Sequence, residues 1–185
     1  MPCSAMHETR RRPCRATYKN VESTLNYWNA LMPCLDAPLP EKVYSVAYAS
    51  GCFDIFHVGH LRYLERAAAH CEQLVVGIPV DAIINANKGK NPINTCELRM
   101  EIIAALRCVT RVVRAETPME HTKPFADFIR QMGAEGVFIG EEWRNTPRWQ
   151  RLGPVLQTHG INVHFLSHTP DISTTLIKQL VRHIT

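Results

Sequence analysis

Between residues 43 and 185, short apolar runs alternate with segments in which apolar residues recur at helical spacing. Short runs of this kind are typical of strands buried in a parallel sheet. The expected strands cover residues 43–49, 74–78, 111–114, 136–140 and 162–166. The expected helices cover residues 58–70, 95–106, 124–132, 148–159 and 173–183. Because the two kinds of element alternate, we expect a single α/β domain with a Rossmann-like, doubly wound parallel sheet of about five strands.

The apolar stripes also predict which face of a helix is buried. In the first helix the stripe consists of Leu61, Leu64, Ala68 and Cys71. In the second helix, for which Thr95 is the expected N-cap, the stripe consists of Leu98, Ile102 and Ala105. Ahead of that helix, the asparagine- and lysine-rich residues 85–94 predict a polar loop.

The first 42 residues do not share this pattern. Residues 1–20 carry no hydrophobic period, and Val21, Leu25 and Trp28 show only weak helical spacing before the proline-containing break at 36–40. We therefore expect residues 1–42 to be an N-terminal extension, partly disordered and with one candidate helix, ahead of the domain over residues 43–185.

Charge and cysteine content narrow the class of protein. The chain carries 21 Lys and Arg against 17 Asp and Glu, a formal net charge of +4, and beyond Arg10, Arg11 and Arg12 its cations are scattered. This argues against a nucleic-acid partner. The seven cysteines form no C-x-x-C pair, which predicts reduced thiols and a cytoplasmic protein rather than a zinc site. No apolar run approaches the roughly 20 residues that a membrane span needs.

The most informative stretch is S-G-C-F-D-I-F-H-V-G-H, residues 50–60. It joins the first expected strand to the first expected helix, and we expect Gly51 to provide a backbone geometry that other residues resist. His57 and His60, three residues apart, are expected to share a face at the helix N-terminus. The unpaired N–H groups and the helix dipole there favour an anion, most naturally a phosphate chain.

These residues resemble the H-x-G-H signature of the nucleotidylyltransferase superfamily, and within it the cytidylyltransferases, most of all the glycerol-3-phosphate cytidylyltransferases. The resemblance covers about residues 44–182. It implies that His57 and His60 are catalytic. It also implies nucleotide binding by Gly51, Cys52, Phe53, Asp54 and Gly59. Asp54 is expected mainly to organise the turn, with contact to a metal or to the ribose as the alternative.

A second motif lies near the end of the chain. Residues 169–178, T-P-D-I-S-T-T-L-I-K, resemble the family's T-x-G-I-S-T-T-x-I-K. Hydroxyls and amides at this helix start would form a second phosphate cradle. The resemblance assigns nucleotide binding here to His168, Ile172, Ser173, Thr174 and Thr175.

Further charged residues complete the expected site. Lys88 and Lys90 on the polar loop can contact phosphates as point charges, and the resemblance makes Lys88 catalytic and acceptor-binding and Lys90 nucleotide-binding. It also makes Arg99 catalytic and Arg107 nucleotide-binding, since a guanidinium pairs with phosphate oxygens in two-point fashion. Glu142 and Trp143, in G-E-E-W after the fourth strand, resemble the family's G-D-D-W nucleotide contact.

The resemblance implies transfer of CMP from CTP to a small phosphorylated or phosphonate alcohol such as glycerol 3-phosphate, with release of pyrophosphate. Mg²⁺ would arrive with the triphosphate, and no protein ligand for it is assigned. A homodimer is expected by analogy only. Three departures leave the acceptor open: His168 replaces an arginine, Pro170 and Asp171 replace an acidic-Gly pair, and Glu116 stands where an acceptor-binding lysine is expected.

Three alternatives remain. In the first, the acceptor is a phosphoethanolamine or a phosphonate. In the second, the nucleotide is ATP and the acceptor is a sugar phosphate, as in the heptose-phosphate adenylyltransferases, which share G-C-F-D-I-x-H-x-G-H. In the third, the chain is a catalytically silent nucleotide-binding regulatory module.

Overall fold

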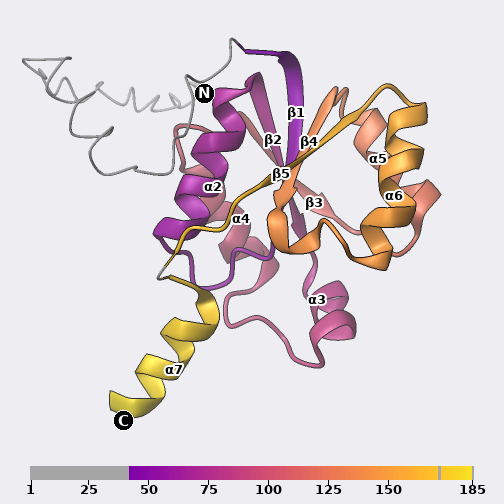
Figure 1. Ribbon diagram of the computed structural model, residues 1–185. Helices are drawn as coiled ribbons and strands as arrows, with labels where there is room; N and C mark the ends of the chain where they lie inside the picture. The colour runs from indigo at the N-terminus through magenta and orange to yellow at the C-terminus, as the bar shows by residue number, and fades with distance from the viewer. Residues whose placement is uncertain (1–41, 171, 185) are drawn as a thin grey trace, which may run out of the picture. The chain divides into compact units, whose positions relative to one another are not determined.

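The computed structural model describes residues 42–170 and 172–184. The expected N-terminal extension, including its candidate helix, lies outside the described residues. The described chain contains one five-stranded sheet, all of it parallel, with strand order β3-β2-β1-β4-β5 (Figure 1). The strands are β1 (Tyr44–Ser50), β2 (Cys71–Pro79), β3 (Arg111–Ala115), β4 (Gly136–Gly140) and β5 (Asn162–Leu166).

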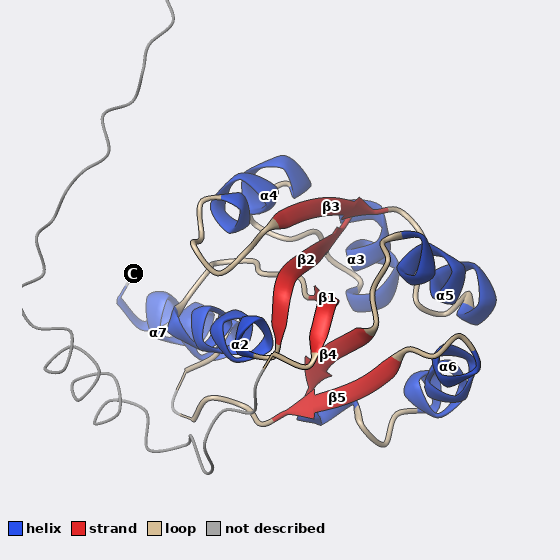
Figure 2. Ribbon diagram, turned by 90° about the horizontal axis from the view of Figure 1, so that it is seen from above, coloured by secondary structure: helices blue, strands red, loops and turns tan. Residues whose placement is uncertain are grey.

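Helices cover both faces of this sheet (Figure 2). On one face, α2 (Val58–Ala69) and α4 (Cys96–Ala104) bury Leu64, Ala67 and Ile103 against the strands. On the other face, α5 (Thr122–Gln131) and α6 (Pro147–Thr158) bury Phe125, Ile129, Leu152 and Leu156. The remaining elements are α3 (Asp81–Lys88), a short 3-10 helix η1 (Glu141–Trp143) and α7 (Thr174–Ile184). The expected α/β Rossmann-like architecture is confirmed.

The central strand β1 shows why this sequence forms a two-faced sheet. Ala47, Tyr48 and Ala49 are all fully buried, and the two alanines contribute to the core on the α2 side while Tyr48 contributes to the core on the α5 side. Successive side chains of a strand point to opposite faces, so a strand covered on both sides must be apolar throughout. Strand order reverses between β1 and β4, and ligands of open parallel sheets bind at the carboxyl ends of the strands at such a point.

Two sequence expectations about local structure were wrong. Residues 85–88 of the expected polar loop belong to the helix α3, which buries only Ile84 and therefore shows no apolar period. It ends where Gly89 takes the left-handed conformation that helix C-caps favour. Cys71, expected on the stripe of the first helix, is instead the first residue of β2, which begins before residue 74.

The buried face of α4 also differs from the expected one. Cys96, Arg99 and Ile103 face the interior, whereas Leu98 is 49% exposed and Ile102 36% exposed. The helix is rotated about its axis relative to the expected orientation, because the side chain of Arg99, and not those of Leu98 and Ile102, occupies the interior. Within residues 42–170 and 172–184, no helix is both long and apolar enough to cross a membrane.

Candidate active site

A cavity of about 990 Å³ opens at the carboxyl ends of the strands, where the order reverses. The ends of β1, β2, β4 and β5 all reach it, through Ser50, Pro79, Gly140 and Leu166. The structure brings most of the expected site residues together around this one cavity. Those residues are Gly51, Cys52, Phe53, Asp54, His57, Gly59, His60, Lys88, Lys90, Glu142, Trp143, His168, Ser173, Thr174 and Thr175.

The turn after β1 has a strained backbone and is tightly packed. Phe53 and Ile55 have φ angles of 50° and 47°, in the left-handed region that residues other than glycine rarely adopt. Gly51 does not lie in that region, so it does not supply the unusual backbone geometry expected of it. Glycine is needed at this position because a Cβ atom would lie 2.8 Å from the ring of Phe53.

His57 is the N-cap residue of α2, and this fixes the proton on its ring. Its Nδ1 accepts a hydrogen bond of 3.1 Å from the backbone N–H of Gly59, so the proton of the neutral ring lies on Nε2. Nε2 lies 3.5 Å from the Oγ1 of Thr174, whose hydroxyl donates to the carbonyl of Asp54 at 3.1 Å. Thr174 Oγ1 can therefore accept from Nε2, which is consistent with the same tautomer.

His60 stacks on His57, with ring centroids 3.8 Å apart and an interplanar angle of 22°. Burial, followed by repulsion from His57, lowers the pKa of His60 from 6.5 to about 4, and His168 and Lys88 act in the same direction against the opposing effect of Asp54. Burial and His168 also lower the pKa of His57. Both rings are therefore neutral near pH 7, and a neutral imidazole offers one N–H donor and one acceptor nitrogen.

The low pKa of His60 predicts that the protein loses stability in mild acid. In the unfolded chain this imidazole takes up a proton near pH 6.5, but in the folded protein it does so only near pH 4. Its contribution is therefore fully present above pH 6.5 and is lost as the pH falls from 6.5 to 4, by about 3 kcal/mol. The check is the free energy of unfolding in urea, measured at a series of pH values across this range. The His60→Gln variant should show a shallower pH dependence, and an unchanged slope would contradict the assignment.

Asp54 is 5% exposed, and its carboxylate is bound by protein donors. Oδ1 accepts from the backbone N–H groups of Ile93 and Asn94, both at 3.0 Å, and Oδ2 lies 2.9 Å from Nζ of Lys178. Burial opposes ionisation, but these backbone hydrogen bonds and the Lys178 ammonium outweigh it and hold the pKa of Asp54 below its usual value. Through these contacts Asp54 joins the turn after β1 to the segment before α4 and to α7.

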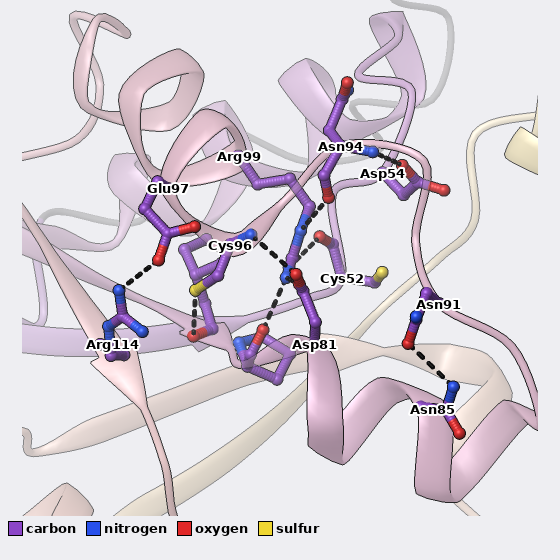
Figure 3. A network of polar contacts seen from close by, with 12 residues as sticks. Cys52, Asp54, Asp81, Asn85, Asn91, Asn94, Cys96, Glu97, Arg99 and Arg114 are labelled. Atoms are coloured by element: carbon purple, nitrogen blue, oxygen red, sulfur yellow. Dashed lines mark hydrogen bonds and ion pairs between the residues drawn. The ribbon is translucent and has the colours of Figure 1, made fainter.

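Arg99 lies in a different place from the one expected (Figure 3). Its side chain is completely buried, and its guanidinium donates to the carbonyls of Asn94, Cys52 and Pro79 and to the carboxylate of Asp81. The distances are 3.0, 2.9, 2.8 and 2.6 Å in that order. Because these acceptors use the planar fork of donors, Arg99 is not placed to bind a phosphate directly. It instead joins the turn after β1 to the end of β2 and to the segment before α4.

Three other expected residues do not line the cavity. Arg107 is exposed, and its charge acts on Glu65, where it opposes the rise in the pKa of that carboxyl. Glu116 is exposed, although its neighbours Ala115 and Thr117 both line the cavity. Ile172 packs beside Gly59, where an added Cβ would lie 3.1 Å from its Cγ2. Glu116 therefore does not place a carboxylate among the cavity walls.

The sequence reasoning missed several cavity residues, including Tyr63 and Arg148. The Tyr63 hydroxyl lies 2.8 Å from the carbonyl of Phe138 and 3.3 Å from that of Ser50, so it links the ends of β1 and β4. Arg148 pairs with Glu120, and its guanidinium lies 5.0 Å from the ring centroid of Trp143. A cation at the start of the helix after G-E-E-W was a usable signal for Arg148. No comparable signal in the sequence pointed to Tyr63.

The comparisons with known proteins agree with this geometry. A family described as cytidylyltransferase-like matches residues 48–180. The bifunctional protein HldE of Pseudomonas syringae and that of Azotobacter vinelandii are each 32% identical over 145 residues, which is 74% of this chain but 28% of theirs. The chain thus spans well under half the length of these relatives.

A solved structure, the lipopolysaccharide core biosynthesis protein from Thermoplasma volcanium, shares the fold. The TM-score is 0.53 at 23% sequence identity, and the match covers 67% of this chain and 95% of that one. The family match, the parallel sheet and the paired histidines lead to the same assignment. The chain belongs to the cytidylyltransferase-like family.

Proposed function

We propose that the protein transfers CMP from CTP to a small phosphorylated or phosphonate alcohol such as glycerol 3-phosphate, releasing pyrophosphate and forming a CDP-alcohol. The observation that carries the proposal is the stacked pair of neutral histidines, His57 and His60, in a cavity that also receives Lys88, Lys90 and the first turn of α7. This arrangement supplies donors and positive charge around a space open to a polyphosphate.

The reaction follows from these donors. An oxygen of the acceptor phosphate attacks the α-phosphorus of the triphosphate, forming one P–O bond, and the bond from that phosphorus to the bridging oxygen breaks to release pyrophosphate. The attacking oxygen is already an anion, so the protein need not remove a proton. Nε2–H groups of His57 and His60 would donate to oxygens on which negative charge builds, and this kind of stabilisation dominates phosphoryl and nucleotidyl transfer.

The start of α7 supplies the second half of the phosphate cradle. Ser173 Oγ accepts from the N–H of Leu176 at 3.1 Å, as a helix-capping side chain does. The first-turn N–H groups of Thr174 and Thr175 have no acceptor within the helix, so they are oriented to receive the β- and γ-phosphates. Lys88 and Lys90 would hold the acceptor phosphate and the triphosphate as point charges.

Mg²⁺ belongs to the proposal as a companion of the triphosphate. The residues that the structure describes include no cluster of three or more His, Cys, Asp or Glu able to hold a metal. Asp54 is engaged by Lys178 and two N–H groups, and the carboxylate of Glu142 folds back over Gly140. The protein therefore fits an ion held by phosphate oxygens and water, whose charge would lower the repulsion between triphosphate and acceptor.

An ATP-dependent reaction on a sugar phosphate is the second candidate, and the similarity to the HldE proteins favours it. The I-S-T-T-x-I-K ending and the position of Glu142 and Trp143 in the cavity support the CTP reading. A phosphoethanolamine acceptor loses its main support, because the exposed Glu116 does not line the cavity.

The proposal also includes a homodimer in the cytoplasm. Leu98 and Ile102, one turn apart on α4, present exposed apolar side chains that a second copy would cover. The cysteines at 52, 71, 96 and 108 are free, in keeping with a reducing compartment.

Pyrophosphate release tests the proposed function directly. The purified protein is given Mg²⁺ with CTP or with ATP, and a panel of glycerol phosphate, phosphoethanolamine, phosphocholine, hydroxyethylphosphonate and sugar phosphates. We expect release with CTP and a small alcohol phosphate. Release only with ATP and a sugar phosphate would replace the proposal by the second candidate. CTP binding without release from any acceptor would favour the regulatory module.

A further inference from the structure

The carboxylate of Asp54 is shared between two segments that approach the cavity separately. Its Oδ1 accepts from Ile93 and Asn94, in the segment that follows Lys88 and Lys90, and its Oδ2 binds Lys178 on α7. We call residues 88–94 the lysine segment. Asp54 itself is almost fully buried, so its position is set by the protein on both sides.

The lysine segment depends on a few polar contacts for its position (Figure 3). In its middle, Asn91 Oδ1 accepts from Nδ2 of Asn85 on α3 at 2.8 Å. At its end, the two N–H groups bind Asp54 and the carbonyl of Asn94 accepts from Nε of Arg99. Ile93 is 66% exposed, so its side chain adds little packing to these bonds. Lys88 is the last residue of α3, so its place is set by that helix, whereas the path of residues 89–94, and with it the place of Lys90, follows Asp54.

The helix α7 is attached at the same residue. Besides the Lys178–Asp54 ion pair, the Thr174 hydroxyl donates to the Asp54 carbonyl, and both contacts come from the first turns of the helix. Beyond them the helix extends away from the sheet (Figure 1), and Leu180 is 55% exposed. The N-terminal end of α7, where a polyphosphate would bind, is thus held at the turn after β1 through Asp54, together with the contacts of Thr174 with His57 and of Ile172 with Gly59.

We propose that Asp54 is a positioning residue that couples occupation of the phosphate cradle on α7 to the ordering of the lysine segment. The ligand classes rest on the proposed function. A polyphosphate bound at the first turn of α7 holds Lys178 against Oδ2, which fixes the carboxylate and strengthens the two N–H bonds at Oδ1. Because coupling between two sites is reciprocal, an anion held by Lys88 and Lys90 raises the affinity of the polyphosphate by the same factor, about five-fold or more.

Hydrogen exchange with inorganic pyrophosphate and Mg²⁺ as the probe tests the coupling. Pyrophosphate is a product of both the CTP and the ATP reaction, so the choice of nucleotide does not matter. In the unsubstituted protein we expect pyrophosphate to slow exchange both in peptides covering residues 172–178 and in peptides covering residues 91–95. In Lys178→Met, compared at equal saturation, the first effect should persist and the second should be lost. Lys123→Met, at an exposed position on α5, should behave like the unsubstituted protein.

A second variant keeps the test informative if Lys178→Met does not fold. Asp54→Asn keeps an oxygen that can accept from Ile93 and Asn94 but removes the charge that binds Lys178, so it should lose the same long-range protection. Equal slowing at residues 91–95 in the unsubstituted protein and in either variant would overturn the coupling. Slowing nowhere in the unsubstituted protein would instead overturn the proposed phosphate cradle itself, and the coupling with it.

Discussion

Replacing His60 by alanine should lower kcat by 10²-fold or more in the pyrophosphate-release assay, because the transition state loses one pre-positioned donor. The ring is neutral and packed against His57, Phe53 and Phe56, so its orientation is set before the substrate arrives. His60→Gln places an amide N–H near the position of the ring Nε2 and should recover part of the rate.

His57 needs a different comparison because it also caps α2. His57→Ala would remove both the donor and the acceptor for Gly59, and it should cost a similar factor in kcat together with some stability. His57→Asn keeps an oxygen near the position of Nδ1 but has no donor near Nε2. It should therefore retain stability and still lose the rate. Near-normal turnover in His57→Asn and His60→Ala would overturn the donor assignment for both histidines.

The largest expected effect on stability comes from Arg99. In Arg99→Met the carboxylate of Asp81 and the carbonyls of Cys52, Pro79 and Asn94 lose their donor, in a site where the arginine side chain is completely buried. We expect the free energy of unfolding, measured in urea, to fall by roughly 3–5 kcal/mol, because three carbonyls lose their donor in a buried site and Asp81, which is 35% exposed, loses its ion-pair partner.

The matched control for Arg99 is another arginine–carboxylate pair close by. Arg114 pairs with Glu97 across the surface, with the two side chains 42% and 64% exposed. Arg114→Met should change the free energy of unfolding by no more than about 1 kcal/mol. Equal effects of the two substitutions would mean that the buried network contributes no more than a surface pair.

Much of the fold could be predicted from the sequence because its strands are short apolar runs with clear limits. The expected strands at residues 136–140 and 162–166 coincide with β4 and β5, and the first helix begins at Val58 as expected. Motifs far apart in the chain line one cavity, as expected, because the carboxyl ends of parallel strands meet at the same edge of the sheet.

The face of α4 and the environment of Arg99 could not be predicted, for one shared reason. Periodicity arguments place apolar residues inside and charged residues outside, but in α4 the charged Arg99 is buried beside Cys96 and Ile103 while Leu98 and Ile102 face out. The hydrogen-bond acceptors that make burial of the Arg99 charge possible are mainly backbone carbonyls from other segments. Every residue has such a carbonyl, so the sequence does not indicate which of them will bind an arginine. Gly51 was misjudged similarly, since the ring that excludes a Cβ there is seen only once the turn is folded.

The hydrogen bond from Gly59 to Nδ1 of His57 has a consequence for the choice of nucleophile. Nδ1, which carries the only basic lone pair of the neutral ring, accepts the hydrogen bond that caps α2. The imidazole can therefore donate a hydrogen bond, but it cannot take a proton from a hydroxyl without breaking this cap. An alcohol would arrive still protonated and find no base in His57. The environment of His57 therefore favours acceptors that are already anions when they enter over neutral alcohols.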